Sequence, residues 1–324
     1  ACYTALGQDN ALRAFHYGEV RFHDALPLSP AGERTLPTPL SWHVRKYGDD
    51  GEAGFDLSLA TTRPADQLTQ RRAGWQISVA DRWESWSPET SSHMRTSVDE
   101  GGGARDGFLF GFVAVAKGTQ YLFDLEGEDA DLLDTIAKAL THHPLRIGRS
   151  RGAEFGEVEI ARCLEDPPNR PAPMRQARES SLRVLCLSDL ALSDESTGGP
   201  RLRPTSADFA LQGEWTFSPE LSFLRFRRYS PFNGMRRRPD TERQVIEAGS
   251  VITFTGGGMV DTAQLQRDLE RGVGMHREAG LGRILIEPAM LADERPKLGI
   301  HHTSAARDGS GPAEAAKCSA PDHV

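Results

Sequence analysis

The sequence contains only four cysteines, and their spacing matches no zinc-binding or disulfide pattern. Its 324 residues include Cys2, Cys163, Cys186 and Cys318, which are far apart and form no CxxC pair. This spacing disfavours a structural zinc site and a disulfide framework, and it favours a reducing compartment such as the cytoplasm. The chain also lacks an apolar run of the roughly 18 residues that a membrane span requires, so we expect no membrane segment.

Motifs of the common enzyme classes are absent as well. The sequence has no GxSxG nucleophile elbow, Walker loop, HExxH zinc motif or dinucleotide-binding fingerprint. These absences argue against a free-standing metabolic enzyme. The chain starts at Ala1 and no signal segment precedes its first elements, so we expect the sequence to begin inside a longer protein.

Positive charge is scarce overall but concentrated locally. The net charge of −8 argues mildly against a nucleic-acid-binding protein. Residues 225–243, however, contain seven arginines against only Asp240 and Glu242. A smaller cluster consists of Arg146, Arg149 and Arg151. Clustered arginines on an acidic chain predict one basic face and another face turned to protein partners or water.

Hydrophobic periodicity predicts an α+β protein. Apolar residues at helical spacing indicate helices at 129–140 and 261–278. Alternating or continuous apolar runs indicate strands at 74–83, 108–115, 182–192, 221–228, 244–255 and 283–287. The second half then reads strand, short helix, two strands, helix, strand. That order favours a fold of two ferredoxin-like (RRM-type, βαββαβ) domains with inserted loops and a β-hairpin finger.

Composition places the expected domain boundaries. Residues 1–166 are the expected N-terminal domain, with the finger at 91–107. Four prolines between 167 and 173 indicate a linker at 167–178, followed by the C-terminal domain at 179–299. The Ser-, Ala-, Gly- and Pro-rich residues 300–324 are expected to form a disordered tail.

The arginine-rich segment carries the first functional hypothesis. Phe223, Phe226, Tyr229 and Phe232 alternate with its arginines, and aromatic rings beside guanidinium groups can stack on unpaired bases. The alternative is that Phe223 and Phe226 belong to the core and the arginines are merely solvated. The RNA-binding candidates in this segment are Arg225, Arg227, Arg228, Arg236, Arg237 and Arg238.

Two glycine-containing loops are further candidates for contacts with an RNA backbone. Arg149 and Arg151 lie beside small residues in the loop 148–152, where they could contact an RNA backbone. The alternative is that this loop is a solvated hairpin turn. Gly280 and Gly282 would let the backbone approach a phosphate, with Arg283 adding a charged contact. The alternative for this second loop is a helix C-cap followed by a tight turn. The RNA hypothesis expects the arginines of these loops and of the arginine-rich segment to line one surface.

The finger contains the main candidates for catalysis. His93 with Asp99 and Asp106 nearby could move protons or bind a metal, although their spacing matches no metal-ligand motif. His93 and Arg95 could instead contact RNA. The glycines around Asp106 make this segment a poor rigid platform for chemistry.

Six motifs in order along the chain resemble the CRISPR-associated RAMP superfamily, and within it the type III-D subunit family (the Csx-ten group). The matching residues are 18–28, 36–42, 93–99, 147–156, 248–251 and 280–284. The resemblance implies a guide-RNA (crRNA)-binding subunit of a type III CRISPR-Cas antiviral effector complex. It also implies a glycine-rich loop on the RNA backbone at Gly280, Gly282 and Arg283, and a finger inserted into the guide at 93–106.

The resemblance also implies partners, and the sequence departs from the family pattern in two places. The partners are other RAMP subunits, the large polymerase/cyclase-like subunit and, indirectly, target RNA. The family's first strand and the glycine turn after it have no match here, so an incomplete N-terminal sheet is expected. Glu100 follows Asp99 where the family commonly has a basic residue, which weakens the expected RNA contact there.

Two other function classes stay open. A metal-dependent endoribonuclease subunit, cutting target or precursor RNA, would use Asp99 or Asp106 with Mg²⁺, and a metal-independent one would use His93 or His16. A pure protein–protein adaptor fits the negative net charge. The guide-RNA-binding subunit that the resemblance implies needs no cofactor.

Overall fold

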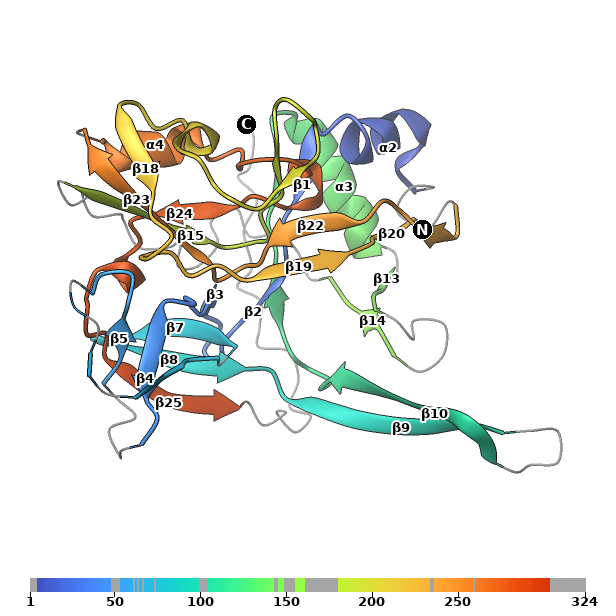
Figure 1. The fold of residues 1–324 in the computed structure, drawn as a ribbon. Helices are drawn as coiled ribbons and strands as arrows, with labels where there is room; N and C mark the ends of the chain where they lie inside the picture. Colours follow the sequence, from blue (N-terminus) through green and yellow to red (C-terminus); the bar gives the residue numbers. More distant parts are fainter. Residues whose placement is uncertain are drawn as a thin grey trace, which may run out of the picture.

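The computed structural model describes residues 5–47, 53–98, 104–142, 145–148, 155–160 and 180–303, without positions 61, 63, 66, 73, 234, 235 and 259. At 96–98, 104–110 and 300–303 it describes the backbone alone. Strands predominate and short helices accompany them, so the predicted α+β class is confirmed (Figure 1). Within these residues, no helix has both the length and the apolar character to cross a bilayer.

The C-terminal half is built on a four-stranded antiparallel sheet. Its order is β18 (Glu214–Phe217), β23 (Val251–Gly257), β15 (Ser181–Cys186) and β24 (Ile284–Ile286). The 3-10 helix η1 (Ser206–Phe209) lies between β15 and β18 along the chain, and α4 (Thr262–Asp268) lies between β23 and β24. Leu182 and Val184 of β15 face one core and Leu185 faces a second. Burial on both faces explains the nearly continuous apolar run of this strand.

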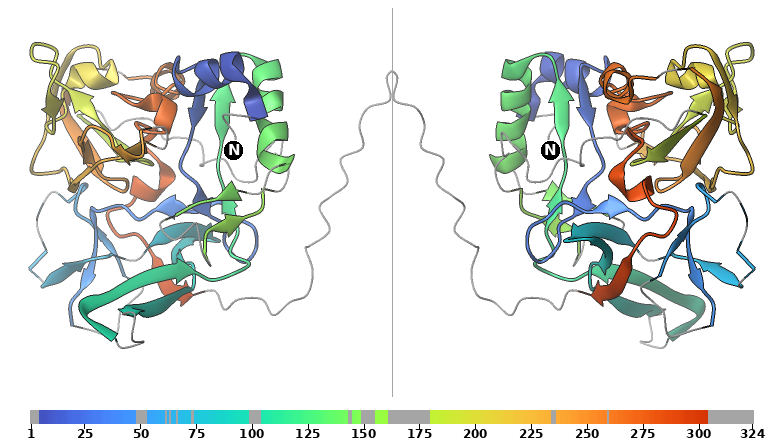
Figure 2. Two further views of the ribbon diagram at one scale, coloured as in Figure 1. Left: turned by 90° about the vertical axis from the view of Figure 1, so that its right-hand side faces the viewer. Right: turned by 90° about the vertical axis from the view of Figure 1, so that its left-hand side faces the viewer.

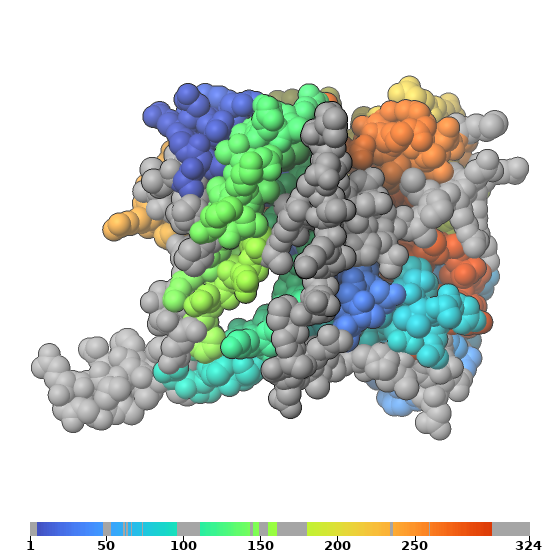
Figure 3. All heavy atoms as spheres, turned by 180° about the vertical axis from the view of Figure 1, so that it is seen from behind, coloured from blue at the N-terminus to red at the C-terminus, as the bar shows by residue number. Residues whose placement is uncertain are grey.

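The N-terminal half contains two pairs of short strands and two helices. β1 (Val20–Phe22) is antiparallel to β12 (Leu125–Gly127), and β2 (Leu26–Pro27) to β11 (Tyr121–Leu122). Helices α2 (Gln8–Phe15) and α3 (Ala130–His142) share a core through Ala11, Ala14, Leu132 and Ile136. The two helices lie on the opposite side of the molecule from β18 and β19, and both are exposed on the rear face (Figures 2 and 3).

A third group of strands combines segments from both ends of the chain. One sheet has the order β25 (Leu298–Thr303), β8 (Arg82–Ser87), β7 (Trp75–Val79) and β3 (Leu36–Pro37), and the other contains β5 (Phe55–Asp56), β4 (Trp42–Arg45) and β6 (Leu68–Gln70). β25 runs parallel to β8 and extends to Thr303. Residues 300–303, assigned to a disordered tail from composition, therefore belong to a strand, because pairing with β8 satisfies their backbone groups. Residues 304–324 lie outside the described residues.

Segments on either side of the predicted linker pack into common cores. Trp42 shares a buried cluster with Leu185, Val251 and Leu298. The linker itself, at 167–178, lies outside the described residues. The two halves are thus joined by a continuous apolar contact that the composition of the linker gave no reason to expect.

A long hairpin projects from the lower group of strands (Figure 1). It consists of β9 (Thr90–Val98) and β10 (Ala104–Val115), with an irregularity in register between Ala104 and Leu109. The finger predicted at 91–107 is part of this hairpin, which is longer than expected. Nearer α3 lies the short pair β13 (Leu145–Arg146) and β14 (Glu157–Val158).

Candidate nucleic-acid interface

The arginine-rich segment folds into a ribbon of paired strands, residues 225–246, which we call the arginine ribbon. β19 (Phe226–Tyr229) is antiparallel to β22 (Arg243–Ile246), and further out β20 (Phe232–Asn233) pairs with β21 (Arg238–Pro239). Its base is fixed because Val245 and Ile246 are fully buried. The ribbon and the β9–β10 hairpin extend toward the same side of the molecule (Figure 1).

The aromatic residues of the ribbon divide between core and surface. Phe226 is 47% exposed and Phe232 is 59% exposed. Phe223, just before the ribbon, is partly buried and lies edge-on to the His43 ring at 5.6 Å. Of the two aromatic side chains whose role was left open, Phe223 therefore packs inward and Phe226 lies at the surface, where it is available for stacking.

Three arginines at the base of the ribbon have acidic partners. The guanidinium of Arg227 is hydrogen-bonded to Asp189, and it lies over the Tyr229 ring, 4.8 Å from its centroid. Arg225 lies 3.8 Å from Glu247, and Arg228 lies 3.8 Å from Glu242. These side chains are exposed, but each must loosen an internal contact before it can bind a phosphate. The ion pairs at 3.8 Å are weak, because both partners are solvated.

The distal part of the ribbon has the opposite character. Arg236, Arg237 and Arg238 are exposed, and among the described residues no carboxylate lies within ion-pair distance of them. The Arg236 backbone N–H donates to the Asn233 side chain at 3.0 Å, which fixes the turn. The nearby Asp240 carboxylate has a lowered pKa because it accepts hydrogen bonds from Thr241 and Asn233 and lies in the field of neighbouring arginines. This end of the ribbon therefore presents three guanidinium groups without an ion pair beside the single nearby carboxylate of Asp240, which leaves an excess of positive charge.

The strands of the hairpin contain three of the candidate residues, His93, Arg95 and Asp106, and the ring contacts of His93 fix its position. The His93 ring is stacked at 5.5 Å on Phe112 and contacts Phe155 at 4.9 Å, and its Nε2 lies 2.8 Å from the Ser91 hydroxyl. Arg95 is exposed. Asp99 and the side chain of Asp106 lie outside the described residues, so the spatial relation of His93 to these carboxylates stays a prediction.

The glycine-rich loop lies inside the protein. Gly280 and Gly282 have φ values of 82° and 81°, in the left-handed region that glycine tolerates best. Both are buried, and a Cβ atom would collide with the carbonyl oxygen of Phe22 at Gly280 and with that of Val273 at Gly282. The backbone of this loop therefore makes the close approach that we expected. The groups that it approaches belong to the protein itself, β1 at Gly280 and the segment around Val273 at Gly282.

Arg283 binds a carboxylate of the N-terminal half. Its guanidinium lies 2.6 Å from Asp124, which also accepts two hydrogen bonds from Arg34 at 2.8 and 2.7 Å. Burial alone would raise the pKa of Asp124, but the hydrogen bonds and charges of the two arginines hold it well below its ordinary value. The loop 280–283 thus clamps the two halves together. In this conformation it offers little to a phosphate.

The arginines that we expected on one surface do not all lie there. Arg228 and Arg237 share the arginine ribbon, whereas Arg283 lies in the contact between the halves. Arg149 and Arg151 lie outside the described residues, and their relation to the ribbon stays a prediction. Arg146 is the described arginine nearest to them in the sequence, and it lies 3.5 Å from Glu157 across the β13–β14 pair.

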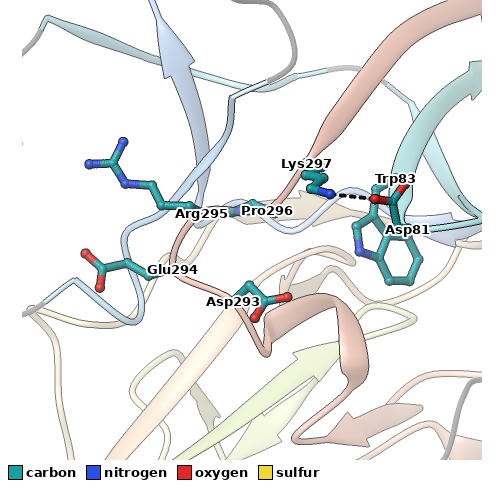
Figure 4. Close-up of a pocket in the computed structure, with 7 residues that line it drawn as sticks. All are labelled: Asp81, Trp83, Asp293, Glu294, Arg295, Pro296 and Lys297. Atoms are coloured by element: carbon teal, nitrogen blue, oxygen red, sulfur yellow. Dashed lines mark hydrogen bonds and ion pairs between the residues drawn. The ribbon is translucent and has the colours of Figure 1, made fainter.

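A shallow pocket of about 420 Å³ lies beside β8 and the start of β25 (Figure 4). Asp81 and Lys297 form an ion pair at its edge, next to the Trp83 ring, and Arg295 lies over the Phe55 ring at 3.9 Å. Its lining carries charges of both signs, so it selects no ligand of one sign. In the described part of the chain no group of three His, Cys, Asp or Glu side chains could hold a metal ion.

A scan against protein-family models and a search of curated proteins both return no match.

Proposed function

We propose that the protein is a guide-RNA-binding structural subunit of a type III CRISPR-Cas antiviral effector complex. The observation that carries this proposal is the distal end of the arginine ribbon. There Arg236, Arg237 and Arg238 stand exposed beside the exposed Phe232, without an ion pair among the described residues. Unpaired cations can bind phosphate without first breaking an internal contact, and adjacent aromatic faces can stack on unpaired bases.

The proposal includes two ferredoxin-like domains. For the C-terminal half it is supported by the antiparallel order β18-β23-β15-β24, with η1 after the first strand along the chain and α4 after the third. A split βαβ unit has the same strand order, which supports the proposal. For the N-terminal half the corresponding elements are α2, β1, β12 and α3. The six motifs in order between residues 18 and 284 support membership of the type III-D family.

The proposed partners are a guide RNA, neighbouring RAMP subunits and the large polymerase/cyclase-like subunit, with target RNA reached through the guide, in the cytoplasm. The projecting β9–β10 hairpin supports an assembly role, because it exposes Met94 and Val113 by about two thirds each (65% and 66%). Apolar side chains on one face of a protruding ribbon favour contact with a partner.

The test is purification of the full chain together with its neighbouring gene products. We expect a small RNA of uniform length in the complex. Arg236→Gln/Arg237→Gln/Arg238→Gln should reduce the RNA retained after a high-salt wash. The control is Arg267→Gln/Arg271→Gln/Arg277→Gln, which removes the same charge from exposed positions on and after α4. Of these, Arg271 forms an ion pair with Glu128, whose loss costs little because both side chains are solvated.

Three outcomes would contradict or redirect the proposal. A complex without RNA would refute it. Undiminished RNA retention in the ribbon variant would favour the adaptor class. RNA cleavage that needs Mg²⁺ and disappears in Asp99→Ala or Asp106→Ala, with binding retained, would favour the endoribonuclease.

A further inference from the structure

An open groove of about 430 Å³ lies at the base of the arginine ribbon. Its apolar lining is formed by Leu202, Phe217, Leu224 and the half-exposed ring of Phe226, with Arg203 at its rim. Phe217 and Leu224 also pack against the main core of the C-terminal sheet. The floor is therefore rigid, while the Phe226 ring remains accessible from solvent.

The rim of the groove is cationic and held in place. The Arg203 guanidinium lies over the Phe217 ring at 5.8 Å and forms no ion pair within the described ranges. Arg201 fixes this loop by donating hydrogen bonds to the Arg203 carbonyl oxygen and to Asp208, both at 2.5 Å. The positive charge of Arg201 thereby offsets the negative charge of Asp208. Arg228 follows Phe226 by two residues on β19, so the two side chains leave the same face of the strand, about 7 Å apart.

We infer that this groove holds one unpaired nucleobase of the RNA, stacked on Phe226, with Arg203 and Arg228 on the flanking phosphates. The inference rests on the proposed function and names the part of the RNA that this site takes. An apolar floor between two cations complements a flat base joined to an anionic backbone on both sides. The volume lies within the range of small-molecule sites and suits a group of nucleoside size.

The test uses the full chain and a short unpaired oligoribonucleotide in fluorescence titrations. Phe226→Ala should weaken binding about 5- to 150-fold, as expected when one base loses its stacking partner. Phe226→Trp should retain most of the affinity, because it preserves the stacking face. The matched control is Tyr47→Ala, which removes a 73% exposed ring that also lies beside a cation, Lys46, but lines neither this groove nor the pocket beside β8.

A second readout reports the base itself. An RNA carrying 2-aminopurine, moved one position at a time, should lose fluorescence at one position on binding to the wild-type chain, and that quenching should vanish in Phe226→Ala. If the wild-type chain binds RNA but Phe226→Ala binds equally well and no position is quenched differently, the groove inference is wrong while the proposed function stands. If the wild-type chain binds no RNA, both are wrong.

Discussion

Neutralising the distal end of the arginine ribbon should weaken RNA binding in a manner that depends on salt. The variant is Arg236→Gln/Arg237→Gln/Arg238→Gln. Because these guanidinium groups form no ion pair in the described part of the chain, their removal strands no internal carboxylate. The hydrogen bond that fixes the turn comes from the Arg236 backbone, and glutamine preserves it. We therefore expect the free energy of unfolding to change by less than about 0.5 kcal/mol.

The size of the effect follows from counterion release. Each phosphate contact on a single strand contributes about 0.7 to the slope of log affinity against log salt. About five contacts give a slope near −3.5 for the wild-type chain, and loss of three reduces it to about −1.4. At about 0.1 M salt this difference corresponds to roughly 100-fold weaker binding, and it should disappear near 1 M salt.

The assay is fluorescence anisotropy with an unpaired oligoribonucleotide over a series of salt concentrations. The control Arg267→Gln/Arg271→Gln/Arg277→Gln carries the same change in net charge and should keep the wild-type slope. Parallel slopes for the ribbon variant and the wild-type chain would refute the reasoning. A loss of affinity that is equal at all salt concentrations would refute it too, because it would indicate altered packing and no loss of phosphate contacts.

The remaining predictions concern two carboxylates. Glu242→Gln should release Arg228 from its 3.8 Å ion pair and tighten RNA binding about 2- to 5-fold at about 0.1 M salt, measured in the same titration; weaker binding would contradict it. Asp124→Asn should lower the free energy of unfolding by about 2–3 kcal/mol in urea at neutral pH, because two arginines lose a part-buried charged partner. The pKa of Asp124 is lowered on folding, so its contribution is complete above its ordinary value of 3.8 and is lost as pH falls below it. The variant should therefore lose less stability than wild type below about pH 4, and an unchanged pH dependence would contradict this assignment.

The sequence predicted elements best where the local pattern was strong. The helix expected at 129–140 is α3 (Ala130–His142), and its first turn is capped by Asp129, which accepts a hydrogen bond from the Leu132 backbone at 3.0 Å. Asp261 caps α4, accepting hydrogen bonds from the backbone N–H groups of Ala263 and Gln264, both at 3.0 Å. Caps and amphipathic spacing are local, so they can be recognised without knowledge of the fold.

Element lengths were predicted less well. The helix expected at 261–278 ends at Asp268, and Gly272 soon after has a φ of 85° that turns the chain away. The strand expected at 244–255 is two strands, β22 and β23, separated by a turn at Gly249. A Cβ at Gly249 would meet the carbonyl oxygen of Thr38 at 2.6 Å. These interruptions arise from packing against distant segments, which apolar periodicity does not register.

The roles of individual arginines could not be predicted from sequence because their partners are remote. Arg227 pairs with Asp189, and Arg283 pairs with Asp124 from the other half of the chain. Spacing and composition indicated basic segments but not which guanidinium groups are already neutralised. The groove at Phe226 was missed for the same reason, since Leu202, Phe217 and Phe226 come together only through the fold.

A chain with an acidic net charge can still bind RNA when some of its arginines form internal ion pairs and others stay exposed and unpaired. Arg34, Arg183 and Arg283 are held by Asp124 and Glu287 in buried or part-buried pairs, where they contribute little charge to the surface, and the pair of Arg283 with Asp124 also joins the two halves. Arg236 to Arg238 retain their charge on an exposed ribbon. Since screening limits exposed charges to about 8 Å at physiological salt, a phosphate at the ribbon responds to these local cations and hardly to the net −8 of the whole chain. Under the proposed function, the position of the unpaired arginines, and not their total number, would decide where an RNA strand binds.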